Sequence, residues 1–160
     1  MSKTIQVDFA TVVEVLRGDT GSVYSDLGYS ANGCNISEIT KFVPVYGDEN
    51  GGEAGDPIDF QVMTVSHRLN LLLTKYDQAQ LDAIAAIIPG GTRGVPPTPG
   101  TLIFQNSYFW KIKLTSANRP RTYGRVIFFQ DPIEFNKGTK HSTVLLVGMA
   151  YKDGSGNIYT

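Results

Sequence analysis

The chain has 160 residues, a length that fits a single domain with its own hydrophobic core, so we expect one domain over residues 1–160. Apolar residues make up 41% of the chain, which is ordinary for a folded protein, and the formal net charge of −1 excludes a uniformly basic nucleic-acid-binding protein. Cys34 is the single cysteine, which excludes an internal disulfide and a zinc site built from several thiolates.

Charge is unevenly distributed along the chain. Residues 1–80 contain 5 Lys and Arg against 11 Asp and Glu, whereas residues 81–160 contain 9 against 4. Two explanations stay open: distant segments that meet and cancel in the fold, or complementary faces on neighbouring copies. The N-terminus lacks the apolar core of a secretory signal, and no apolar run approaches the roughly 20 residues that cross a bilayer. We therefore expect a soluble protein, made in a cytoplasm, with no membrane partner.

The first half of the chain predicts strands around one long polar segment. Residues 39–46 alternate in polarity, which predicts a strand that is interrupted at Pro44. Residues 47–57 are acidic and rich in glycine, without a large apolar side chain, so they predict a long extended loop that is mobile or is ordered by a neighbour. The alternation in residues 58–62 predicts a half-buried strand.

One helix is predicted, directly after a strongly apolar strand at residues 67–74. In that strand Leu69, Leu71 and Leu73 share one face, while Leu72 adds apolar weight to the other, which suggests cover on both sides. Asp77 and Gln80 then form a capping-box pattern, and four apolar side chains follow at helical spacing. These four are Leu81, Ile84, Ala85 and Ile88. Residues 89–91, Pro-Gly-Gly, end the predicted helix, which spans about 77–88.

The second half predicts a loop at residues 89–100 and then more strands. Period-two alternation places Trp110, Ile112 and Leu114 on the core face of a strand over residues 108–115. Further short strands are predicted at residues 102–104, 126–129, 132–135 and 143–151, with a hairpin turn at 153–157. The expected fold is therefore mainly β: a β-sandwich or small barrel with one flanking helix and the long loop at about 47–57.

Candidate chemistry is sparse. His67 and His141 are the two histidines, and neither has a nucleophile or metal ligand at a recognisable spacing, so we interpret both as surface or half-buried strand residues. The acidic loop does not match a calcium-binding EF-hand, and no phosphate-binding Walker sequence is present. We expect no catalytic residues, no cofactor and no metal, and thus a protein that is not an enzyme.

Basic residues gather in the second half of the chain, with aromatic residues between them. The set consists of Lys111, Lys113, Arg119, Arg121 and Arg125. Such a pattern is compatible with a platform for single-stranded nucleic acid, with a solvated face, or with a face that binds a partner protein.

Several segments together resemble structural proteins of tailed bacteriophage particles, most closely tail tube proteins. They are residues 51–60, the strand 67–73, the lead into the helix at 74–77, and the pieces 14–18 and 26–30. The resemblance implies a β-sandwich or small barrel with one helix, similar to the needle-tube proteins of type VI secretion. It also implies six copies joined edge to edge in rings, which stack through the extended loop around a channel for DNA.

The resemblance further implies partners and site residues. Inter-subunit stacking would use the carboxylates in and beside the loop: Asp48, Glu49, Glu53, Asp56 and Asp59. The basic set named above would face a partner. The expected partners are further copies of the chain and other tail proteins (sheath, baseplate or neck), with non-specific passage of DNA, in a virion assembled in the host cytoplasm. The alternatives are a neck, tail-terminator, distal-tail or head-decoration subunit of the same particle, or a nucleic-acid- or carbohydrate-binding β module.

Overall fold

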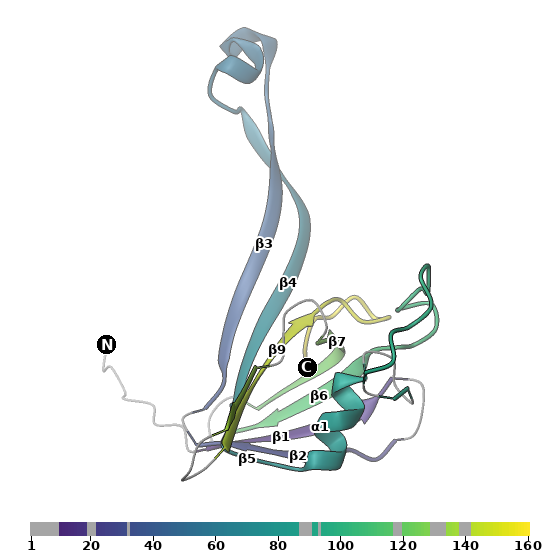
Figure 1. Cartoon of the computed structure of the whole chain (residues 1–160). Helices are drawn as coiled ribbons and strands as arrows, with labels where there is room; N and C mark the ends of the chain where they lie inside the picture. The colour runs from purple at the N-terminus through teal and green to yellow at the C-terminus, as the bar shows by residue number, and fades with distance from the viewer. Residues whose placement is uncertain are drawn as a thin grey trace, which may run out of the picture.

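A computed structural model describes residues 10–18, 22–31, 33–86, 91–92, 94–116, 120–128, 134–137 and 142–160. The described residues form nine strands, one α-helix and two short 3-10 turns (Figure 1). The mainly β fold with a single flanking helix is therefore confirmed. The strands are β1 (Thr11–Arg17), β2 (Ser25–Ser30), β3 (Asn35–Val45), β4 (Asp59–Leu73), β5 (Lys75–Tyr76), β6 (Trp110–Thr115), β7 (Arg121–Ile127), β8 (Glu134–Lys137) and β9 (Ser142–Ala150).

All nine strands belong to one antiparallel sheet in the order β3-β4-β9-β7-β6-β1-β2-β5, with β8 paired to β9. β9 pairs with β4 along one side, and its other side is shared by β8 near its start and by β7 at its end. The sheet bends back on itself at the connection between β4 and β5, which consists of Thr74 alone. The Thr74 N–H donates to the Tyr29 carbonyl on β2 at 3.1 Å. The two ends approach each other at this corner, and the sheet stays open instead of closing into a barrel.

The core lies inside this bend. Leu69, Leu71 and Leu73 of β4 are fully buried, while Leu72 between them is 40% exposed, so this strand is covered on one side and the expected cover on both is wrong. On β6 the predicted core face is confirmed, since Trp110, Ile112 and Leu114 are all buried. Further core side chains come from β1, β2, β7 and β9: Val13, Val15, Leu27, Tyr123, Val126, Val144 and Leu146.

One close backbone approach explains a glycine. Gly28 on β2 lies opposite Tyr76 on β5 with φ at +149°, and a Cβ there would come within 2.0 Å of the Lys75 carbonyl oxygen. The short β5 pairing therefore depends on a residue without a side chain.

The helix α1 (Gln78–Ala85) begins where the sequence predicts. The Asp77 carboxylate accepts from the Gln80 N–H at 3.0 Å, which is the expected N-cap, and the Asp77 N–H donates to the Leu27 carbonyl on β2. Leu81 and Ile84 pack into the core. The helical residues end at Ala85 with Ala86 as the cap, and the last two residues of the predicted helix, 87–88, lie outside the described residues.

Three strand predictions need correction. β3 runs through Pro44 without interruption because it is the edge strand, where a missing N–H costs no ladder hydrogen bond. The strand predicted at residues 102–104 is absent, since residues 103–107 form turns, and the strand predicted over 108–115 begins only at Trp110 as β6. The turn at 153–157 is present, but the chain after it pairs with β7, through a bridge between Tyr159 and Tyr123, and does not form a hairpin with β9.

Candidate assembly site

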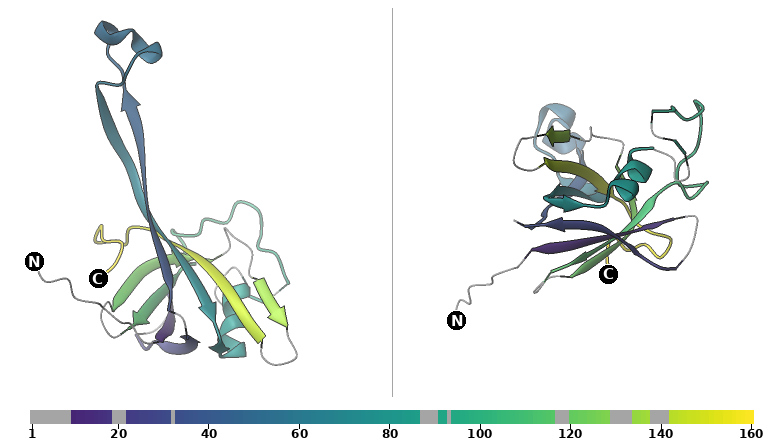
Figure 2. Two further views of the ribbon diagram at one scale, coloured as in Figure 1. Left: turned by 90° about the vertical axis from the view of Figure 1, so that its left-hand side faces the viewer. Right: turned by 60° about the horizontal axis from the view of Figure 1, so that its bottom comes forward.

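A long part of the β3–β4 hairpin leaves the body of the molecule. We call residues 39–65 the arm; Figures 1 and 2 show it extending away from the rest of the sheet, with the two 3-10 turns at its tip. Every β4 residue from Asp59 to Thr64 is exposed, whereas Ser66 and His67 are buried where the arm meets the body. The strand expected at residues 58–62 is present as the start of β4, but its expected half-burial is wrong, because no second layer lies beneath this stretch.

The arm has two different faces, because residues opposite each other in an antiparallel pair share a face. Phe42 lies opposite Val62, and Pro44 lies opposite Phe60, so these four form one apolar arm face. Phe42 and Phe60 contact edge to face, with ring centroids 5.3 Å apart, yet they remain 56% and 54% exposed. The opposite face is mixed and carries Lys41, Val43, Val45, Asp59, Gln61 and Thr64.

An exposed apolar face of this kind, set between polar surroundings, is typical of a surface that binds another protein. The arm also projects from the body, so the side chains of this face are accessible to another molecule. Seven strand residues from Ile39 to Val45 extend roughly 24 Å at about 3.4 Å per residue. The arm can therefore reach well onto a neighbouring molecule.

The tip of the arm is compact and acidic. Its turns, η1 (Asp48–Asn50) and η2 (Gly52–Ala54), are joined by Gly51, whose φ of +88° is in the left-handed region that favours glycine. The Ile58 N–H donates to the Val45 carbonyl at 2.9 Å and closes the loop. The predicted loop carboxylates Asp48, Glu49, Glu53 and Asp56 are exposed here, and Asp59 is exposed where β4 begins.

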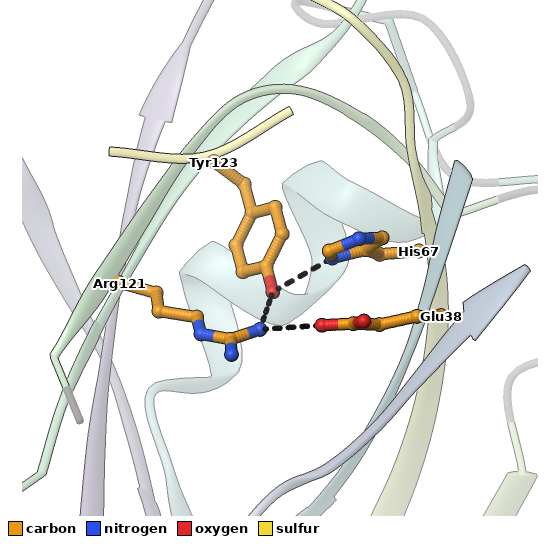
Figure 3. A network of polar contacts seen from close by, with 4 residues as sticks. All are labelled: Glu38, His67, Arg121 and Tyr123. Carbon is orange, nitrogen blue, oxygen red and sulfur yellow. Dashed lines mark hydrogen bonds and ion pairs between the residues drawn. The ribbon is translucent and has the colours of Figure 1, made fainter. Parts of the chain in front are cut away.

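The arm is joined to the body by a cluster of polar and aromatic side chains (Figure 3). We call Glu38, His67, Arg121, Tyr123 and Tyr159 the root cluster. Arg121 Nη1 donates to the Tyr123 hydroxyl at 3.3 Å and lies 3.6 Å from Glu38 Oε1. The Tyr123 hydroxyl is 3.4 Å from His67 Nδ1. The Arg121 guanidinium lies 4.3 Å from the centre of the Tyr159 ring. The cluster thus ties β3 and β4 to β7 and to the last residues of the described chain.

The environment of this cluster favours a neutral imidazole. Burial lowers the pKa of His67, the Glu38 carboxylate acts against this shift, and the Arg121 guanidinium adds to it. Burial likewise raises the pKa of Tyr123, so its hydroxyl keeps its proton. The interpretation of His67 as a surface or half-buried residue is wrong, since only 4% of it is exposed.

The structure does not bring the predicted basic residues into one patch. Lys111 and Lys113 point away from the core on β6, and Lys113 Nζ lies 3.6 Å from Glu14 Oε2 on β1. Arg121 stands opposite Leu114, on the core face, and belongs to the root cluster. Arg119, like His141, lies outside the described residues.

Arg125 is also directed toward aromatic side chains. Its guanidinium lies 4.8 Å from the centre of the Phe104 ring and 5.2 Å from that of Phe109. Phe109 is buried, whereas Phe104 is 38% exposed. They do not form an open stacking platform beside the two lysines.

Other candidate sites are weak in the part of the chain that the structure describes. No group of three or more His, Cys, Asp or Glu side chains there could hold a metal ion. Burial raises the pKa of the Cys34 thiol to about 11, so this cysteine stays protonated and unreactive at neutral pH. Among the same residues, no helix combines the length and the apolar content needed to span a membrane.

Comparison with known proteins gives no relative: no family model, no curated protein and no solved structure matches this chain.

Sequence reasoning missed the apolar arm face and the root cluster. The signal for the first was present, since the alternating segments on both sides of the acidic loop carry Phe42, Phe60 and Val62. The alternation was interpreted as burial against the protein's own core. The root cluster has no local signal, because its five residues come from three strands distant in sequence, β3, β4 and β7, and from the end of the described chain.

Proposed function

We propose that this chain is a non-enzymatic structural protein of a tailed bacteriophage particle, whose copies form rings, six to a ring, that stack into the tail tube. The observation that supports it best is the arm, an extended hairpin with an exposed apolar face and an acidic tip. Leaving such a face in water is unfavourable, and burial against a partner removes that cost. Stacked rings of six copies are the assembly that the resemblance to tail tube proteins implies.

The partner that fits the arm is a second copy of the same chain. The arm carries one lysine against five carboxylates, whereas the rest of the chain carries 13 Lys and Arg against 10 Asp and Glu. Arm and body therefore have opposite net charge, which favours docking of the arm of one copy on the body of another.

The sheet supplies a second route for self-association. Among the described strands, β3 pairs on one side only, so its 11 residues present an unpaired backbone edge. A long open edge promotes aggregation of a monomer, and joining the sheets of neighbouring copies satisfies its hydrogen-bonding groups. Edge pairing within a ring would use the backbone of β3, and arm docking between rings would use the side chains of the apolar arm face, so the two contacts draw on different groups of the hairpin.

The alternatives differ in what they require. A neck, tail-terminator, distal-tail or head-decoration subunit of the same particle would need a second phage protein before it assembles. A nucleic-acid-binding β module would need a joint basic and aromatic surface, and Arg121 and Arg125 are instead engaged with Tyr159, Phe104 and Phe109. No observation favours this module over assembly.

Sedimentation velocity of the purified protein over a concentration series, at low and high salt, tests the proposal. We expect a species of about six times the mass of one chain, and larger stacks at high concentration, with weak dependence on salt because apolar burial drives assembly. A monomer at every concentration, together with salt-sensitive binding of single-stranded DNA, would contradict it and support the binding module.

A further inference from the structure

The root cluster contains a chain of hydrogen bonds. Arg121 donates to the oxygen of the Tyr123 hydroxyl, and the hydroxyl proton can be donated to Nδ1 of a neutral His67 that carries its own proton on Nε2. Protonation of His67 removes this acceptor and adds a second cation beside Arg121.

We propose that His67 is a proton-operated clamp, which holds the arm to the body when neutral and releases the arm root when protonated. Protonation of His67 can affect the arm root because His67 lies where the exposed arm becomes a buried strand. The same cluster includes Tyr159, and the Thr160 and Thr122 backbones exchange two hydrogen bonds of 2.9 Å beside it. Release of His67 therefore loosens both the arm root and the last residues of the chain from β7.

Charged and titratable groups surround His67 from each neighbouring element. Glu38 faces it from β3, Arg121 and Tyr123 from β7, and Tyr159 from the chain end, while its partner on β9 is the apolar Ala150. Glu38 is the group that favours the imidazolium, but its side chain is 61% exposed and is already within 3.6 Å of Arg121. Solvent therefore screens the attraction between Glu38 and a positive charge on His67, so Glu38 stabilises the imidazolium only weakly.

The clamp regulates the site of the proposed function, so its effect on ring stacking rests on that proposal. Mildly acidic solution would free the arm to change direction, and neutral solution would hold it in the docking direction. The clamp itself is a property of one molecule. It can be tested on dilute, unassembled protein, and its failure would then be distinguishable from failure of the proposed assembly.

The test combines two measurements at pH 7.5 and pH 5. An NMR titration follows the imidazole signals of His67, and amide hydrogen exchange, corrected for the intrinsic effect of pH, follows Thr122, Ala150 and Thr160. We expect His67 to titrate below the ordinary histidine value of about 6.5, with loss of protection at these three amides over the same pH range. Amides paired between β1 and β6 serve as an internal control and should keep their protection.

Two variants separate the clamp from general acid sensitivity. His67→Gln keeps a neutral acceptor at every pH and should remove the pH dependence at the three amides, whereas His141→Gln, which alters the other histidine, should leave it intact. Equal protection of the wild-type protein at both pH values would overturn the proposal. So would the same loss in His67→Gln as in the wild type. If His67→Gln does not fold, the wild-type titration still decides, since a His67 that titrates without any change in these amides is no clamp.

Discussion

Replacing Phe42 by alanine should weaken assembly strongly while leaving the isolated subunit folded. Phe42 is 56% exposed on the apolar arm face and contributes little to the core of its own subunit. Its contact with Phe60, which is equally exposed, is the part of its packing that the subunit itself would lose.

The magnitude follows from the exposed area. A phenylalanine side chain offers roughly 200 Å², so complete docking of the exposed part would bury about 110 Å². At about 25 cal/mol per Å² this contributes roughly 2–3 kcal/mol to each arm contact. The concentration at which stacks of rings first form should therefore rise roughly 30- to 150-fold, since about 1.4 kcal/mol corresponds to a factor of ten.

The assay is sedimentation velocity over a concentration series of wild type, Phe42→Ala and the matched control Gln61→Ala. Gln61 is exposed on the opposite face of the same arm, so its replacement should shift the onset less than threefold. Circular dichroism checks that each variant is folded. The reasoning is refuted if both variants shift the onset equally, or if neither shifts it.

Three further predictions address the corner of the sheet, the tip and the root. Gly28→Ala should introduce about 2–4 kcal/mol of strain and backbone clash and so lower the unfolding temperature by roughly 5–15 °C. Gly154→Ala, where the added methyl group would meet open space, should leave the unfolding temperature unchanged. Equal unfolding midpoints of the two variants in calorimetry would refute the close approach at Gly28. Glu49→Lys combined with Glu53→Lys should raise the assembly onset less than about tenfold, because exposed charges contribute little; a larger shift in sedimentation would make the tip the dominant contact. The pKa of His67 is lower in the folded than in the unfolded chain, so the free energy of unfolding should fall as pH drops below about 6.5 and level off below the folded value. Urea unfolding at several pH values should show this slope for the wild type and a flatter one for His67→Gln.

Local patterns predicted the parts of the fold that depend on local chemistry. Alternation alone placed Trp110, Ile112 and Leu114 in the core, and the spacing from Asp77 to Gln80 located the start of the helix. The same alternation misled in the arm, because period two reports which residues share a face and not whether anything covers that face. Whether a strand lies over the body or extends beyond it depends on the lengths of its neighbours, which no local pattern records.

The strand register determines which face of the sheet each basic residue occupies. Lys111, Lys113, Arg121 and Arg125 look alike as positive charges spaced along neighbouring strands. The pairing of Leu114 with Arg121 places that arginine on the core face, opposite to the two lysines. The partners of Arg121 and His67 come from strands distant in sequence, so the root cluster was beyond prediction from spacing.

Negative-stain electron microscopy of the purified protein across a concentration series tests the central claim most directly. Edge pairing of neighbouring copies predicts rings with a central hole a few nanometres wide, and docking of the arm on a second copy predicts that the rings stack into tubes as concentration rises. Dispersed single subunits at every concentration would contradict assembly of the chain on its own and would remove the claim that it is a main tube subunit.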